Sequence, residues 1–308
     1  MTTLRASRPP RTGIPVRTRG LAGWSGRGIL AVVLIVFVLF FAIPIVWLLL
    51  AAGKNAHALL VDNAFSFGTL QDAVANWNQL FSFQGGAIVG WIGNSGLYAI
   101  GALLITLIVS VPAGYALALT EFRLRRPLLI VTLVVMLIPN TALVLPEFLE
   151  LNLVGLIGNP LSVILPMSFF PFGVYLTYIY FSTSIPRDLL SAARIDGCSE
   201  ISVFTKIALP LAAPVVALVA FFSFVQNWNN FFLPFVMLPS SSGYPVQVGL
   251  TTLLASTPAF NPTAAGSESV QLPTLALATI ISVLPVLIMF LFSQRFLVSG
   301  MTAGGTKE

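Results

Sequence analysis

The apolar segment Ile29–Ala52 decides the fold class of this chain, and it reads ILAVVLIVFVLFFAIPIVWLLLAA. A helix of about 20 apolar residues crosses the roughly 30 Å hydrocarbon core of a bilayer, so this segment is long enough to span it. It also exceeds the apolar region of a secretory signal peptide, which holds about 7–15 residues. We therefore expect an uncleaved membrane helix here.

Working outward from this segment, five more uncharged stretches meet or approach the same length. They are Leu97–Leu119, Leu128–Leu145, Leu161–Phe181, Ala213–Leu233 and Thr274–Phe292. Backbone amides inside lipid must be satisfied within the segment, and the alternating pattern of a barrel strand is absent, so all six stretches are predicted to be helices. The sequence predicts an all-α polytopic membrane protein with six transmembrane helices over residues 29–300.

The composition excludes several function classes. Of the 308 residues, 57% are hydrophobic and 8% are charged, whereas a soluble domain carries roughly a quarter charged residues. An ordinary globular enzyme, a disordered protein and a nucleic-acid binder are excluded on this ground, despite a net charge of +5. With one cysteine and one histidine in the whole chain, we expect no catalytic residues and no metal site.

The basic residues predict the orientation. If the six stretches cross the membrane in turn, every Lys and Arg except Lys54 falls on one side of it. Cytoplasmic loops hold the excess of Lys and Arg, so both termini are expected in the cytosol. Residues 1–28 would form a basic N-terminal tail and residues 301–308 a C-terminal tail.

The loop Ser184–Pro210, on the same side, carries its own folding signals. Pro186 suits the first turn of a helix, and Gly197 suits the left-handed position that ends one. Ser199 can cap a second helix, which Pro210 is expected to break. The sequence predicts a short helix, a glycine corner and another short helix beside the membrane, a construction that is typical of a loop that grips another molecule.

This loop resembles the EAA loop of permease subunits in bacterial ABC importers, whose motif is Glu-Ala-Ala, three residues, Gly, nine residues, then Ile-x-Leu-Pro. The glutamate position is Ser191, which is a departure from the motif, and the pair that glutamate makes with the partner would be missing or supplied by a neighbour such as Asp188. The motif positions in this chain are Ser191, Ala192, Ala193, Asp196, Gly197, Ile207, Leu209 and Pro210.

Softer features resemble the maltose-type sugar permeases, among them Asn94-Ser95, Ile138-Pro139 and Trp228-Asn229. The resemblance implies the type I ABC importer permease fold in a bacterial inner membrane. It also implies a second permease subunit, two copies of a cytosolic ABC ATPase, an extracytoplasmic solute-binding protein and a sugar as solute. ATP and Mg²⁺ would be bound by the ATPases, and no cofactor by this chain.

The energy source follows from two absences in the sequence. None of the six stretches contains Asp, Glu, Lys, Arg or His, which usually mark ion or proton pathways when they lie in a membrane. The chain also lacks the G-x-x-x-x-G-K-[ST] motif of a phosphate-binding loop. Energy is therefore expected from a partner.

Amide side chains gather at the end of the fifth stretch around Trp228, and they are the candidates for a cavity or gate. Gln226 and Asn230 are four residues apart and would share one helix face. Two interpretations remain open: the amides line a path for a neutral, hydroxyl-rich solute, or they join helices within the permease pair. The candidates are Gln226, Asn227, Asn229 and Asn230.

Two alternatives to a sugar importer also remain open. The first is a permease of the same class for another solute, such as a polyol phosphate, polyamine, amino acid or peptide; the uncharged stretches disfavour a strongly charged cargo. The second is a stand-alone channel or membrane enzyme. Co-purification with an ATPase subunit would separate the second alternative from the importer.

Overall fold

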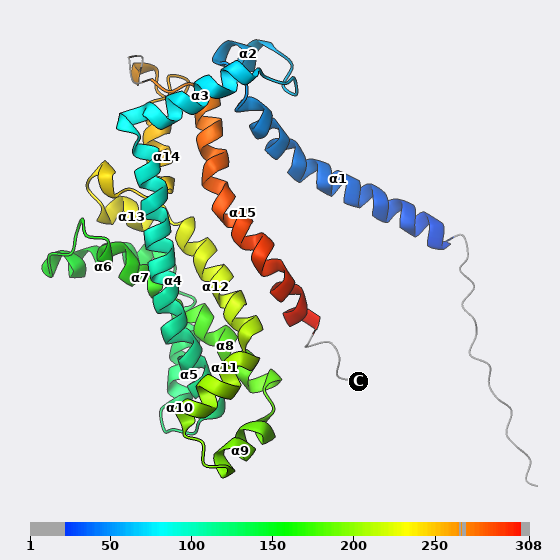
Figure 1. Ribbon diagram of the computed structural model, residues 1–308, viewed down its shortest axis with the longest axis vertical. Helices are drawn as coiled ribbons and strands as arrows, with labels where there is room; N and C mark the ends of the chain where they lie inside the picture. Colours follow the sequence, from blue (N-terminus) through cyan, green and yellow to red (C-terminus); the bar gives the residue numbers. More distant parts are fainter. Residues whose placement is uncertain (1–21, 265, 267–268, 303–308) are drawn as a thin grey trace, which may run out of the picture. The chain divides into compact units, whose positions relative to one another are not determined.

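The computed structural model describes residues 22–264, 266 and 269–302, and every regular element among them is helical. The helices are α1 Ala22–Ala51, α2 Ala56–Val61, α3 Leu70–Ser82, α4 Ala87–Leu119, α5 Arg125–Val135, α6 Asn140–Leu153, α7 Leu161–Ser168, α8 Pro171–Ser184, α9 Arg187–Ile195, α10 Glu200–Val203, α11 Leu209–Leu211, α12 Ala213–Trp228, α13 Phe232–Met237, α14 Val246–Ala255 and α15 Leu272–Thr302, with the 3-10 turns η1 Phe83–Gly85, η3 Ser241–Gly243 and η4 Pro262–Ala264 and the π-turn η2 Phe204–Ala208 (Figure 1). The predicted all-α architecture is confirmed.

The chain forms two units, one that ends at Trp47 and one that begins at Leu48. The described part of the first unit consists of α1 up to Trp47. This helix starts before the predicted span, contains Pro44 and continues to Ala51. Most of the predicted N-terminal tail (1–28) and of the predicted C-terminal tail (301–308) lies outside the described residues.

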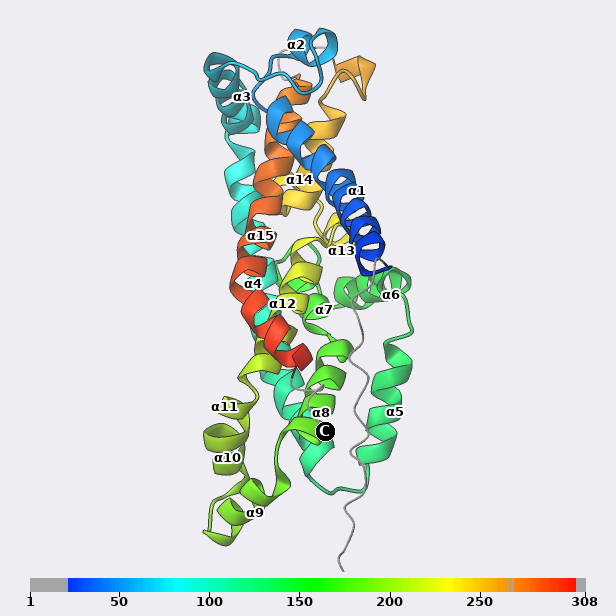
Figure 2. The same cartoon turned by 90° about the vertical axis from the view of Figure 1, so that its right-hand side faces the viewer.

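The second unit is built around α4, on which α7, α8 and α12 pack (Figure 2). Gly114 allows the closest of these contacts, because a Cβ there would come within 2.8 Å of the backbone nitrogen of Tyr178 on α8. The buried Thr177 hydroxyl donates hydrogen bonds to the carbonyls of Ser110 at 3.1 Å and Gly173 at 2.9 Å. These contacts join α4 and α8 into one close-packed pair.

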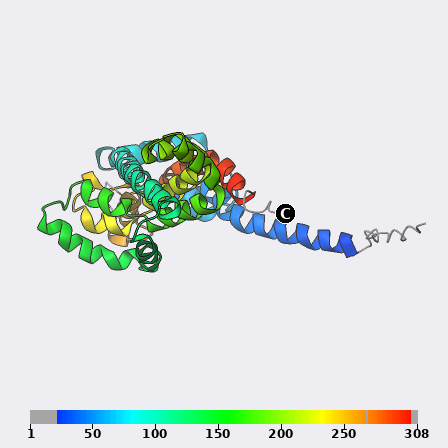
Figure 3. The ribbon, with the colours of Figure 1, turned by 90° about the horizontal axis from the view of Figure 1, so that it is seen from below.

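The predicted third span, Leu128–Leu145, is wrong as an unbroken helix. The chain bends by 104° between α5 and α6, around residues 136–139. Pro139 explains the break, since the residue before a proline is disfavoured in the α region and the helix ends there. α6 consequently lies crosswise to α4, and it is seen lengthwise in the view along the long axis (Figure 3).

The predicted fifth span, Ala213–Leu233, is also too long. Helix α12 ends at Trp228, and α13 starts at Phe232. Pro234 lacks an N–H, and its ring would clash with the carbonyl of Asn230 in a continuous helix. Before α12, the segment Glu200–Leu211 is bent from the helix by 76°.

Among the described residues, four helical segments are long and apolar enough to cross a membrane, and two bent pairs bring the number to as many as six. The four are Gly28–Ala51, Ala87–Leu119, Leu161–Ser184 and Leu272–Gln294. One bent pair contains the predicted third span, and the other contains residues 213–228 of the predicted fifth span. The polytopic fold therefore stands, although the predicted third, fourth and fifth spans are interrupted, the fourth of them at residues 169–170 between α7 and α8.

Candidate functional site: the loop Ser184–Pro210 and the broken helices

The first half of the loop folds as predicted. Helix α9 follows Pro186 and ends at Ile195. Gly197 then takes a φ of +84°, and its N–H donates to the Arg194 carbonyl at 3.0 Å. The Cys198 N–H donates to the Ala193 carbonyl, also at 3.0 Å. This pair of hydrogen bonds is the Schellman closure that glycine favours at a helix end.

The second half agrees with the prediction only at its start. The Ser199 hydroxyl accepts a hydrogen bond from the Ser202 N–H at 3.3 Å and caps α10. Pro210, however, does not break the helix, which continues to Leu211. The π-turn η2, in which the Leu209 N–H reaches the Phe204 carbonyl, loosens the helix just before the proline, so the ring enters without a clash. The bend comes at Ala212 instead.

The motif positions divide between the two faces of the loop. Ala193 is buried, and Ile207 and Leu209 pack against the core. Exposed positions are Ser191, Ala192, Asp196, Gly197 and Pro210. Two large apolar side chains beside the glycine corner, Ile195 and Ile201, are also exposed.

The two neighbouring leucines of α9 divide in the same way. The buried Leu190 side chain packs in the core of the chain, whereas Leu189 is exposed. The face that a partner can reach therefore carries small residues and isolated apolar side chains, together with the charged side chains of Arg187, Asp188 and Asp196.

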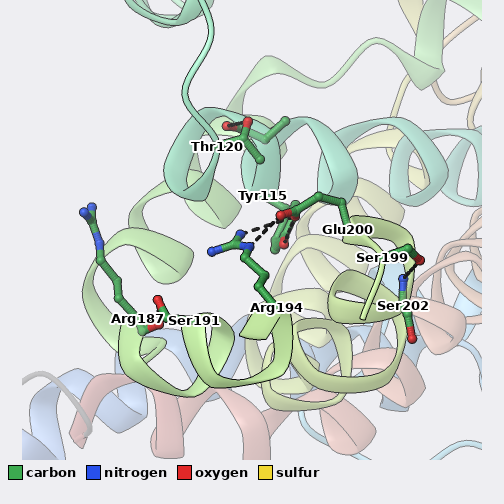
Figure 4. Close-up of polar contacts among 9 residues, drawn as sticks. Tyr115, Thr120, Arg187, Ser191, Arg194, Ser199, Glu200 and Ser202 are labelled. Carbon is green, nitrogen blue, oxygen red and sulfur yellow. Dashed lines mark hydrogen bonds and ion pairs between the residues drawn. The ribbon is translucent and has the colours of Figure 1, made fainter. Parts of the chain in front are cut away.

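A charged cluster fastens the inner face of the loop to α4 (Figure 4). Arg194 on α9 donates from Nε to Glu200 Oε1 at 2.6 Å and from Nη2 to Oε2 at 3.3 Å. The hydroxyl of Tyr115 on α4 donates to the same Oε2 at 3.0 Å. The hydrogen bond from Arg194 is the main reason that the pKa of the Glu200 carboxyl lies below its ordinary value. Glu200 thus connects α9, α10 and α4.

The ring of Tyr115 reinforces this connection. It is buried, and its centroid lies 5.5 Å from that of Phe181 on α8 and 5.0 Å from that of Phe204 in η2. The sequence analysis identified neither Tyr115 nor Glu200 as a contact of the loop. Since 85 positions separate the two residues, no local pattern could have paired them.

The four amide candidates do not form one group. Gln226, Asn227 and Asn230 line a cavity of about 70 Å³, whereas Asn229 is not among its lining residues. Because α12 ends at Trp228, Gln226 and Asn230 do not share a helix face as predicted. Asn227 is buried and donates to the Ser223 hydroxyl at 3.3 Å, which gives this amide a structural partner.

Helix α6 brings one unexpected residue to the same cavity. Glu147 lies two residues beyond the predicted third span, and it is half-buried and lines the cavity beside the amides. The bend between α5 and α6 places it there. A hydropathy pattern that treats the third span as straight gives no sign of this placement.

Comparison with protein-family models identifies one match within this fold. Residues 110–303 match the model described as the binding-protein-dependent transport system inner membrane component. The matched region includes the whole loop Ser184–Pro210 and the helices that surround the cavity.

Individual relatives cover nearly the whole chain. The arabinooligosaccharides transport system permease protein AraQ of Halalkalibacterium halodurans is 32% identical over 275 residues, which cover 88% of this chain and 93% of the relative. The sulfoquinovosyl glycerol transport system permease protein SmoH of Agrobacterium fabrum is 31% identical over 284 residues, 91% of this chain and 93% of the relative.

One solved structure shows the same fold. A chain of a bacterial ABC transporter involved in the import of the acidic polysaccharide alginate superposes with a TM-score of 0.77 at 24% identity. The superposition covers 90% of this chain and 98% of that one.

Proposed function

The chain belongs to the family of binding-protein-dependent transport system inner membrane components, and we propose that it serves as one of two permease subunits in an ATP-driven importer of a sugar or oligosaccharide. A second permease subunit, two copies of a cytosolic ABC ATPase and an extracytoplasmic solute-binding protein would complete the importer. ATP and Mg²⁺ would bind to the ATPases, so this chain itself would catalyse no reaction.

The proposal of a sugar rests on the relatives and on the chemistry of the spans. The names of both relatives refer to carbohydrate-containing solutes. The apolar stretches contain no ionisable side chain, which suits a neutral solute better than a strongly charged one. Amide groups near the cavity can both donate and accept hydrogen bonds with hydroxyl groups.

The orientation of the chain is part of the proposal. All basic residues except Lys54 would face the cytosol of a bacterial cell if the spans cross its inner membrane in turn. The loop Ser184–Pro210 would then lie on the side where the ATPases are.

One observation carries the proposed coupling: the loop has an exposed outer face and a bonded inner face. A Cβ placed on Gly197 would meet nothing within 4 Å, so the corner is open to a partner. On the inner face, Arg194, Glu200 and Tyr115 tie the loop to α4. A displacement of the loop by closing ATPases would therefore pull on α4 directly.

Substitution at the glycine corner tests the docking. Gly197→Arg adds a long side chain to the exposed face, and we expect uptake and stimulated ATPase activity to fall to background while the protein still inserts. Gly155→Arg is the matched control, because Gly155 also has a positive φ (+69°) and open space around its Cβ but lies between α6 and α7.

The control carries the same backbone strain and the same added charge as the test variant, so a difference between them isolates docking. Both variants should be purified in mild detergent, and the amount of co-purifying ATPase should be measured beside transport in proteoliposomes. Full uptake by Gly197→Arg would refute the docking assignment.

A further inference from the structure

Three interrupted helices meet at one place in the second unit. The α5–α6 break ends at Asn140, Phe169 lies between α7 and α8, and Asn230 lies between α12 and α13. All three residues line the cavity of about 70 Å³. A second hollow, of about 230 Å³, shares Asn140, Phe169 and Gln226 with it. Helix breaks at membrane depth are tolerated where they line a cavity or are buried in protein.

The cavity lies near the middle of α4 along its length. Thr106, in the central part of α4, donates from its hydroxyl to the carbonyl of Ser168 at 2.9 Å, directly before Phe169. Ser223 on α12 approaches the same hydroxyl at 3.5 Å, and Asn227 donates to Ser223. This buried chain of polar groups fixes α7 and α12 to α4 just behind the cavity. In transporters, solute sites occur near the midplane where discontinuous helices converge.

Glu147 gives the cavity its chemical character. It is the one ionisable side chain among the described lining residues, and no donor in the described part of the chain forms a hydrogen bond or ion pair with its carboxylate. The other polar lining groups are neutral: Asn140, Thr141, Gln226, Asn227 and Asn230. A half-buried carboxylate with unused acceptors, placed among amides, can accept from two adjacent hydroxyls of a solute.

We propose that this cavity and the adjoining hollow together form a solute subsite on the permease pathway, and that Glu147 selects neutral, hydroxyl-rich solutes against acidic ones. The inference rests on the proposed importer function and deepens it by naming the solute class. The hydroxyls of a neutral sugar donate hydrogen bonds to Glu147, while amides such as Gln226 donate hydrogen bonds to the remaining sugar oxygens. A sugar acid would instead bring a second negative charge close to the carboxylate, in surroundings less polar than water.

The test measures the charge selectivity of the cavity without relying on the binding protein. The full complex carries Cys198→Ser, which removes the single cysteine of the chain. Gln226→Cys then places one reactive thiol in the wall of the cavity. The rates at which a cationic and an anionic methanethiosulfonate reagent modify this thiol are measured in two proteins, one with Glu147 intact and one with Glu147→Gln. The substitution should raise the anionic-to-cationic rate ratio by about fivefold or more, since it removes one nearby charge.

Glu150→Gln is the matched control. It removes the same charge from the same helix, but Glu150 is exposed and does not line the cavity, so its field there is screened more strongly and the ratio should change much less. An unchanged ratio in Glu147→Gln, or an equal change in both variants, overturns the inference.

A second arm identifies the solute class. Arabinotriose should slow the modification of the Gln226→Cys thiol when Glu147 is intact, and a galacturonate trimer should do so only with Glu147→Gln. Equal protection by both trimers with Glu147 intact also overturns the inference. ATPase stimulation is measured on each variant to verify folding. If the rate ratio is unchanged in Glu147→Gln while Gly197→Arg still uncouples the complex, this inference is wrong and the proposed function stands.

Discussion

Removing one hydroxyl from α4 should uncouple the proposed importer. Tyr115→Phe keeps the aromatic ring between Phe181 and Phe204 and deletes only the donor to Glu200. The loop would then remain tied to α4 by packing alone. If that hydrogen bond transmits the movement of the loop, fewer solute molecules should cross for each ATP hydrolysed.

The expected size follows from the exposure of the carboxylate. A hydrogen bond to a charged group contributes about 1.5–3 kcal/mol, but the Glu200 side chain is 53% exposed, and solvent screening lowers the contribution to about 1 kcal/mol. At 1.4 kcal/mol for each factor of ten, this corresponds to about a fivefold loss in the population of the tied state. We expect a several-fold lower ratio of transport to ATP hydrolysis.

Tyr98→Phe separates coupling from stability. Tyr98 is also buried in α4, and its hydroxyl donates to the Gly243 carbonyl at 2.8 Å, away from the loop. Its loss should lower the free energy of unfolding by about 1 kcal/mol without changing the transport-to-ATP ratio. Both variants are assayed in proteoliposomes with the complete complex. Equal ratios for the two variants would contradict the role given to Tyr115.

Two further predictions concern the same framework. Gly114→Ala should lower the free energy of unfolding by about 1–3 kcal/mol, because the new methyl group meets the backbone of Tyr178 and α8 must move away; thermal unfolding of the purified chain measures this loss. The pKa of Glu200 in the folded chain lies below the ordinary carboxyl value of 4.5. Its pair with Arg194 therefore stabilises the loop fully above pH 4.5, and this stabilisation is lost as the pH falls through the lower pKa of the folded state. Arg194→Gln should weaken this dependence of loop stability on acidic pH, which hydrogen exchange of the loop measures at a series of pH values. If the variant keeps the full pH dependence, the assignment to the Arg194–Glu200 pair is wrong.

The loop could be predicted from the sequence because its folding chemistry is local. Proline at a helix start, glycine in the left-handed region and serine as a cap each act within a few residues, and Pro186, Gly197 and Ser199 all occupy those roles. The contacts of Glu200 could not be predicted in this way. They depend on how α4 packs against the loop, which only the tertiary structure determines.

The helix breaks show where hydropathy reasoning fails. An apolar run indicates only that a segment prefers lipid or the protein core. It does not indicate the backbone conformations that Pro139 and Pro234 impose. Both prolines were visible in the sequence, yet each of the two stretches around them was predicted as a single span. This simplification concealed the position of Glu147. A straight third span would place that residue beyond the membrane, whereas the bent pair α5–α6 brings it to the cavity.

The same pair of helices reaches both the loop and the cavity, and this arrangement explains how one could act on the other. On α4, Tyr115 contacts the loop and Thr106 contacts the cavity wall, nine residues or about 13 Å away along the helix. On α8, Phe181 packs against Tyr115, while Phe170, which directly precedes the helix, lines the second hollow. Between these points Thr177 bonds α8 to α4, so the pair resists shear. A pull applied at the loop would therefore move the cavity wall rather than dissipate in side-chain rearrangement.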